Sequence, residues 1–141
     1  MTQESLNNYD PPNSWDELVA LSPRIGHSVP EANRNLDDLV IYHHYNETVP
    51  KGIRLQKIVS LIGDNDYKIL KNDFPYSRLI QNLPKVTHYC LWSRIGELTP
   101  ETIKQEIVKN FPSQRYMYLE NSPETKSMPE IWHCHIFIEE K

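Results

Sequence analysis

Near its end the chain reads Ile131-Trp132-His133-Cys134-His135-Ile136-Phe137-Ile138, and this stretch decides the fold. Its large apolar and aromatic side chains favour a β-strand. Because successive side chains of a strand point to opposite faces, His133, His135 and Phe137 should share one face. The other face then carries the side chains expected in a core, which are Trp132, Cys134, Ile136 and Ile138.

Two imidazoles on one strand face make a candidate site. Given the rise of a strand, His133 and His135 should lie roughly 7 Å apart. Neutral imidazoles suit nucleophilic attack on phosphorus, proton transfer or metal binding. The structural alternative is that each ring is held by a backbone carbonyl or a water and takes no part in chemistry.

Length and composition limit the class of protein. The 141 residues predict one domain, residues 14–141, after a flexible polar tail, residues 1–13. No stretch approaches the roughly 18–20 apolar residues that cross a bilayer, so we expect no membrane partner. No signal sequence is visible, which predicts a cytoplasmic location that extends to the nucleus. A net charge of −4 without a long basic run argues against nucleic acid as a partner. No feature indicates an oligomeric state.

The order of elements predicts an α+β fold. Ser14 and Glu17 form a capping box that starts a short helix, and Pro23 should end it. Leu36, Leu39, Val40 and His43 recur at helical spacing. Further elements are expected as helices over residues 34–46, 53–62 and 100–111, and as strands over residues 67–70, 86–93, 115–120 and 131–138. This layout favours an antiparallel sheet with one packed helix and an added N-terminal helical segment.

Further candidate residues lie in the strand-rich half. Asn72 and Asp73 begin a turn and offer acceptors and an amide donor that suit ribose hydroxyls or a base edge, with an ordinary Asx turn as the alternative. His88 should share a strand face with Cys90. Together with His133 and His135, His88 would make a three-histidine zinc site. No carboxylate or Cys-x-x-Cys motif accompanies this set, so we expect no metal. Cys90 and Cys134 are expected to be free buried thiols.

Four segments carry a resemblance to a known family: residues 71–76, residues 86–93, Lys126-Ser127 and residues 133–136. In this order they resemble a small fungal family that includes the N-acetylglucosamine-induced protein and whose domain has no assigned function. The resemblance covers nearly the whole chain after residue 14. Cys134 departs from it, because the family usually has an aromatic residue there. The resemblance points toward amino-sugar metabolism.

The turn at residues 72–74, the segment at residues 118–121 and the strand at residues 133–135 are more distantly similar, in this order, to the histidine-triad superfamily, especially its galactose-1-phosphate uridylyltransferase branch. This resemblance implies a histidine-triad-like sheet, with His135 as the nucleophile on the α-phosphorus and His133 as its orienting partner. It also implies that Asn72 and Asp73 hold the ribose or base of the ligand. Asn121 and Ser127 would then approach the phosphates, and His88 would lie near the site.

One departure from the triad keeps several functions open. The third triad position is Phe137, which cannot donate a hydrogen bond to the phosphate. The first function is a nucleotidyl or phosphoryl transferase or hydrolase that acts on a nucleotide sugar or another phosphate ester without a cofactor. The second is a protein that binds or senses a nucleotide or phosphosugar without turnover. The third is a three-histidine metal-dependent enzyme.

Overall fold

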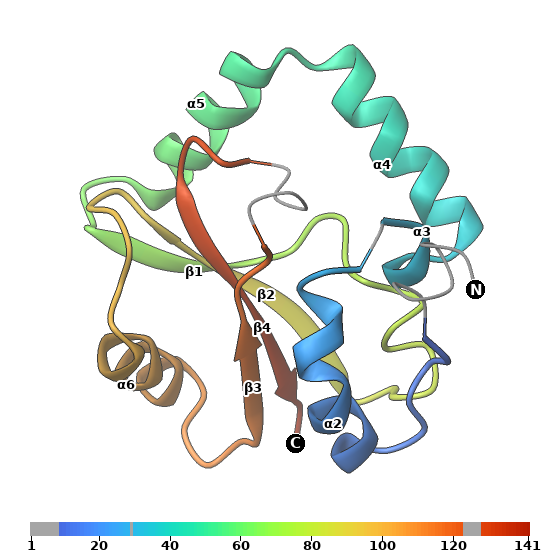
Figure 1. The fold of residues 1–141 in the computed structure, drawn as a ribbon. Coiled ribbons are helices and arrows are strands. Elements are labelled where there is room, and N and C mark those ends of the chain that lie inside the picture. Colours follow the sequence, from blue (N-terminus) through green and yellow to red (C-terminus); the bar gives the residue numbers. More distant parts are fainter. Residues whose placement is uncertain (1–8, 29, 123–127) are drawn as a thin grey trace.

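The fold combines helices with an antiparallel sheet (Figure 1). The computed structural model describes residues 9–28, 30–122 and 128–141. In chain order the elements are α2 (Trp15–Ile25), α3 (Pro30–Asn33), α4 (Leu36–Thr48), α5 (Lys51–Ile62), β1 (Tyr67–Lys71), β2 (Val86–Ser93), α6 (Pro100–Asn110), β3 (Tyr116–Leu119) and β4 (Trp132–Glu139). The predicted α+β class is confirmed. Within the described residues, no helix combines the length and the apolar character that a membrane span requires.

The histidine strand β4 lies inside the sheet. The strand order is β1-β2-β4-β3, and each neighbouring pair is antiparallel. In the β2–β4 register, Cys90 lies opposite His135 and Trp92 lies opposite His133. Side chains directly opposite each other in such a pair project to the same face. The histidines of β4 therefore meet side chains of β2, which come from a segment more than forty residues earlier.

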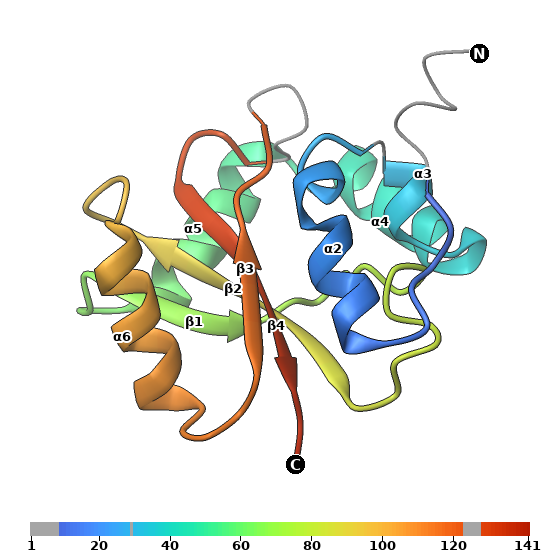
Figure 2. The same ribbon diagram turned by 60° about the horizontal axis from the view of Figure 1, so that its bottom comes forward.

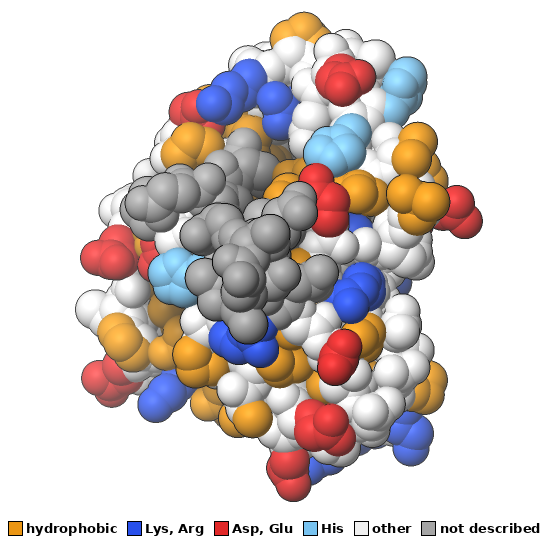
Figure 3. Space-filling model, turned by 45° about the vertical axis from the view of Figure 1, so that its right-hand side comes forward, with side chains coloured by type: hydrophobic (Ala, Val, Ile, Leu, Met, Phe, Trp, Pro, Cys, Tyr) orange, Lys and Arg blue, Asp and Glu red, His pale blue; other side chains and the backbone are white. Residues whose placement is uncertain are grey.

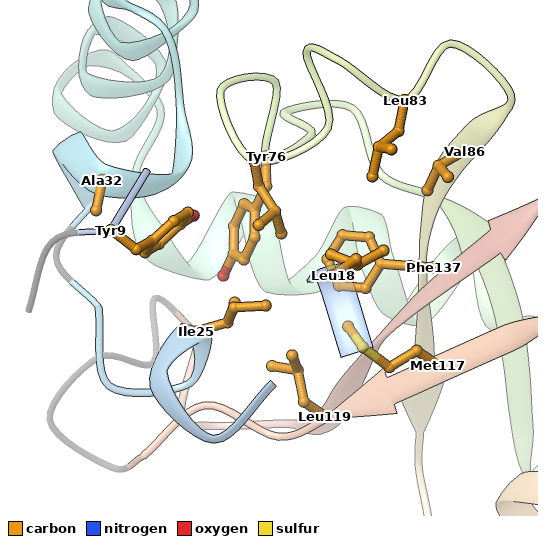
Figure 4. Close-up of a cluster of buried hydrophobic side chains, with 11 residues drawn as sticks. Tyr9, Leu18, Ile25, Ala32, Tyr76, Leu83, Val86, Met117, Leu119 and Phe137 are labelled. Atoms are coloured by element: carbon orange, nitrogen blue, oxygen red, sulfur yellow. The ribbon is translucent and has the colours of Figure 1, made fainter. Parts of the chain in front are cut away.

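The two faces of β4 are divided as the sequence predicts. Cys134, Ile136 and Ile138 pack into one cluster with apolar side chains of α6. Phe137 packs on the opposite face, in a second cluster with Leu18 of α2 (Figure 4). Figures 1 and 2 show α6 on one side of the sheet, and α2 with the arm formed by α4 and α5 on the other. The histidine face is therefore enclosed by α2 and by this arm.

Two helices begin at the predicted caps. The side chain of Ser14 accepts the backbone N–H of Glu17 at the start of α2. Thr99 accepts the N–H of Thr102 at the start of α6, where Pro100 occupies the first turn. Both caps satisfy an N–H group that has no partner within its own helix.

The prediction that Pro23 ends the first helix is wrong, because α2 continues to Ile25. Proline removes one backbone hydrogen bond from a helix interior. Packing outweighs that loss here, since Ile25 is 1% exposed and belongs to the core. The helix ends at Gly26, whose carbonyl accepts the N–H of Ser122 at 2.9 Å. A Cβ on Gly26 would lie 2.8 Å from the carbonyl oxygen of Glu120, so this close approach requires glycine.

The helix α4 forms where its spacing predicts, but that spacing does not mark a buried face. Only Leu39 is buried, whereas Leu36 is 75% exposed and Val40 is 60% exposed. Figure 3 shows apolar side chains that reach the surface on the α4 side of the molecule. The helix does not rest on a core, because its inner face borders a pocket.

The predicted tail, residues 1–13, is packed against the domain in its described part. Tyr9 is 5% exposed, and its hydroxyl donates to Asn33 Oδ1 at 2.6 Å. Pro12 is also buried. Tyr9 fills the cluster next to Ala32, and this burial fixes the last residues of the segment. Residues 1–8 lie outside the described residues.

Candidate functional site

A pocket of about 270 Å³ lies over the histidine face of β2 and β4. Cys90, His133 and His135 line it from the sheet, and the turn after β1 lines one side. The helices α4 and α5 line the side opposite the sheet. Its volume falls near the lower end of the range for small-molecule sites. Five of the predicted site residues therefore border one cavity together with the arm, namely Asn72, Asp73, Asn121, His133 and His135.

Hydrogen bonds fix where the protons of His88 and His135 lie. The backbone N–H of Tyr76 donates to His88 Nδ1 at 3.1 Å, so neutral His88 carries its proton on Nε2. His88 Nε2 lies 2.8 Å from His135 Nδ1 and therefore donates to it. The proton of neutral His135 is then on Nε2, which lies 3.3 Å from the Tyr76 hydroxyl oxygen. The two rings form a directed chain that starts and ends at Tyr76.

Burial keeps both rings neutral. His88 is 1% exposed and His135 is 5% exposed. Burial is the largest cause that holds the pKa of His88 well below its usual 6.5, and the positive charge of Arg34 adds to it. Burial also lowers the pKa of His135, with further contributions from His88, His133 and Arg34. Neutral imidazole is the form that acts as a base or nucleophile.

The hydrogen bonds favour a division of roles opposite to the one that the resemblance implies. His135 presents an N–H at Nε2, where a nucleophile needs a lone pair. His133 Nδ1 lies 3.2 Å from the carbonyl oxygen of Ile131. A carbonyl only accepts, so the His133 proton is on Nδ1 and the lone pair is on Nε2. The His133 ring stacks on Trp92 with centroids 4.2 Å apart, which fixes its plane.

The residues present fit a metal ion poorly. Within the described part of the chain, the ligand atoms that lie within 4.8 Å of one another belong to His88, Cys90 and His135, and His133 is outside this group. His88 Nδ1 already accepts the Tyr76 N–H, so metal coordination at Nε2 would require lone pairs on both nitrogens. Burial also raises the pKa of the Cys90 thiol to about 12, which opposes the thiolate that a metal needs. Cys90 and Cys134 are free and buried, as predicted.

Arg34, which the sequence analysis missed, is the main charge inside the pocket. Arg34 is 7% exposed, and its Nε donates to the carbonyl oxygen of Phe74 at 3.1 Å. The guanidinium lies 3.8 Å from the Tyr42 ring centroid and 4.9 Å from that of Tyr76. Among the described residues, no carboxylate lies within 4.0 Å and no acceptor bonds to its terminal nitrogens. A buried cation without a counter-charge is unfavourable, so this position favours an anion.

Asn72 and Asp73 lie at the pocket, with the turn geometry that the sequence analysis gave as the alternative. Asn72 Oδ1 accepts the N–H of Phe74 at 2.7 Å, which is an Asx turn. Its Nδ2 donates to Cys90 Sγ at 3.3 Å. Asp73 is exposed and lies 3.6 Å from the Lys57 ammonium. Asn72 therefore holds the turn in place, and Asp73 borders the mouth.

Asn121 also lines the pocket, and Ser127 lies outside the described residues. Asn121 Nδ2 donates to the Tyr76 hydroxyl at 2.9 Å, so Asn121 contacts the same oxygen as His135. Asn121 Oδ1 is buried without a partner among the described residues. Burial raises the pKa of Tyr76 to about 12, so its hydroxyl stays neutral. Tyr76, which the sequence placed only in a turn, joins the residues expected at the site.

Comparisons with known proteins address the fold and leave the chemistry open. No protein-family model matches the chain, and no curated protein sequence matches it at a significant level. The structure is similar to the crystal structure of HTC1, with a TM-score of 0.61 and 20% sequence identity. The alignment covers 90% of this chain and 85% of that one. At this identity the likeness concerns the fold alone, so the fold occurs in another protein.

Proposed function

We propose that the pocket binds a small organic anion that carries a phosphate or carboxylate group. The observation that carries this proposal is Arg34, a buried guanidinium without a carboxylate partner in the described structure. The planar guanidinium fork matches both anions with two parallel hydrogen bonds. The described lining of the pocket is also basic in a chain of net charge −4, because its charged residues are Arg34, Arg54, Lys57, Lys71 and a single acid, Asp73.

Aromatic rings next to Arg34 provide a surface for the carbon skeleton of the ligand. Phe74 packs against Tyr45 with centroids 4.7 Å apart and against Tyr42 at 5.8 Å. All three rings line the pocket. A sugar phosphate or a mononucleotide offers the matching combination of an anion and a larger body. The modest volume favours these over a dinucleotide.

Replacing Arg34 tests the proposal directly. Arg34→Gln keeps a donor near the Phe74 carbonyl and removes the positive charge. We expect the Kd for inorganic phosphate and for N-acetylglucosamine 6-phosphate to rise about 10- to 100-fold, the effect of one charged hydrogen-bonding partner. Isothermal titration calorimetry measures both constants.

The matched control is Arg94→Gln, which removes an exposed arginine outside the pocket. Its phosphate affinity should equal that of the wild type. Unchanged binding by a folded Arg34→Gln protein would contradict the proposal.

A second candidate function is transfer or hydrolysis on a nucleotide sugar or another phosphate ester. The observation that favours it is the proton arrangement of the two histidines, which gives His133 Nε2 a lone pair and His135 Nε2 a proton in one pocket. Under this function His133 would act as the base or nucleophile, and His135 would act as a donor. The resemblance to the N-acetylglucosamine-induced family makes amino-sugar phosphates the first substrates to try.

Two variants separate the roles of the histidines. His133→Asn keeps a donor near the Ile131 carbonyl and loses the Nε2 lone pair, whereas His135→Gln places an amide near the Tyr76 hydroxyl. We expect turnover of a panel of nucleotide sugars and sugar phosphates to fall at least about 100-fold in His133→Asn, and less in His135→Gln. The assay is run with and without EDTA. If the wild-type protein binds phosphate but turns over no member of the panel, the catalytic function is rejected and only the binding function remains.

A further inference from the structure

Arg54 of α5 shares the chemical situation of Arg34. It is half-buried and lines the same pocket. Its Nε donates to the carbonyl oxygen of Val49 at 3.2 Å, and its Nη1 donates to Asn46 Oδ1 at 3.0 Å. Within the described residues, none of the carboxylates lies within 4.0 Å of it. Among the described residues, the second guanidinium of the pocket is therefore hydrogen-bonded only to neutral acceptors. Glu130 feels its charge but forms its ion pair with Lys51, at 2.6 Å.

Both guanidiniums contact side chains of the helix α4. Arg34 stacks over Tyr42, and Arg54 bonds to Asn46. Tyr42 and Asn46 are four residues apart in α4, so they are neighbours on one face of the helix with Cβ atoms roughly 5–6 Å apart. Both residues line the pocket. The two guanidiniums thus contact side chains on successive turns of one helix face.

Two like charges that line one pocket repel each other, most strongly where burial reduces screening by solvent. Asp73 is the only acid among the described residues that line the pocket, and it is exposed and paired with Lys57. An anion bound to each guanidinium would cancel the repulsion and supply the missing counter-charges. A single phosphate on Arg34 would leave Arg54 uncompensated.

We infer that the ligand of this pocket carries two anionic groups, one held by Arg34 and the other by Arg54. This inference rests on the proposed function and narrows its substrate class to molecules such as a sugar bisphosphate or a phosphorylated carboxylic acid. Because Arg54 comes from α5 and Arg34 precedes α4, such a ligand would also join the two ends of the arm.

The test compares two ligands that differ in one anionic group. Glycerol 3-phosphate carries a phosphate alone, and 3-phosphoglycerate adds a carboxylate a few bonds away. We expect the wild type to bind 3-phosphoglycerate at least about 10-fold more tightly, as one further charged hydrogen-bonding pair would give. Calorimetry on wild type, Arg54→Gln, Arg54→Lys and the control Arg94→Gln measures these affinities.

Each variant has a distinct expected result. Arg54→Gln should lose the preference for 3-phosphoglycerate and bind glycerol 3-phosphate within about twofold of wild type. Arg54→Lys keeps the charge and should retain most of the preference, which also controls for folding. Equal losses for both ligands in Arg54→Gln would mean that one anion bridges the two guanidiniums, and this would overturn the inference. No preference in the wild type would overturn it as well. Unchanged binding of both ligands in Arg34→Gln would instead overturn the proposed function.

Discussion

Below pH 6.5 we expect the free energy of unfolding to fall by as much as about 3 kcal/mol per pH unit, because two buried imidazoles stay neutral in the folded protein. In the unfolded chain, His88 and His135 each take up a proton as the pH falls through about 6.5. In the folded chain both pKa values lie well below that, since burial opposes the charged form. At acidic pH the unfolded state then binds about two more protons than the folded state. The contribution of the two imidazoles to the free energy of unfolding is therefore fully present above pH 6.5 and is lost as the pH falls.

Urea unfolding at several pH values measures this dependence. A His135→Gln variant removes one of the two imidazoles and leaves an acceptor for His88 Nε2, so its slope should be about half, near 1.4 kcal/mol per pH unit. His43 is an exposed histidine on α4 and provides the matched control, since His43→Gln should keep the wild-type slope. A His135→Gln slope equal to that of wild type would show that the ring takes up its proton without unfolding.

The histidine face could be predicted from the sequence because it depends on a strong local pattern. Side chains alternate along a strand, so the placement of His133, His135 and Phe137 on one face follows once β4 is a strand. Which side chains meet that face depends on the β2–β4 register. The sequence places Cys90 and His88 on one face of their strand, but nothing local sets Cys90 opposite His135. The His88–His135 bond therefore could not be predicted in detail.

The residues missed by the sequence analysis come from segments without a periodic or motif pattern. Arg34 lies between α3 and α4, and its position over Tyr42 depends on how those helices turn. Arg54 lies on α5 among alternating apolar and polar residues, where a lone arginine is ordinarily a solvated side chain. Both become candidates only when the fold shows that they border one pocket and form no ion pair with a carboxylate in the described part of the chain. Burial and missing partners are tertiary properties, which a sequence pattern does not encode.

The same limit applies to Phe137, which the sequence presents as a triad position that has lost its histidine. In the structure its ring is fully buried and stacks on His88 with centroids 4.5 Å apart. It packs with Leu18 and Met117 and does not line the pocket (Figure 4). The position therefore belongs to the core of the histidine face. Its aromatic ring supports the imidazole that orients His135.

We expect Phe137→Ala to lower the free energy of unfolding by about 3–5 kcal/mol, the cost of removing a buried phenylalanine from a packed core. Urea unfolding at pH 7.5 measures this loss. Phe111 is a half-buried phenylalanine on the other face of the sheet, so Phe111→Ala should cost clearly less.

Phe137→His restores the residue of the triad, but it places a polar ring among apolar side chains and should also destabilise the protein, by about 1–3 kcal/mol. Because position 137 faces the core, we expect no gain in turnover of nucleotide sugars over the wild type. A stable Phe137→His protein with higher turnover than the wild type would show that the position reaches the ligand.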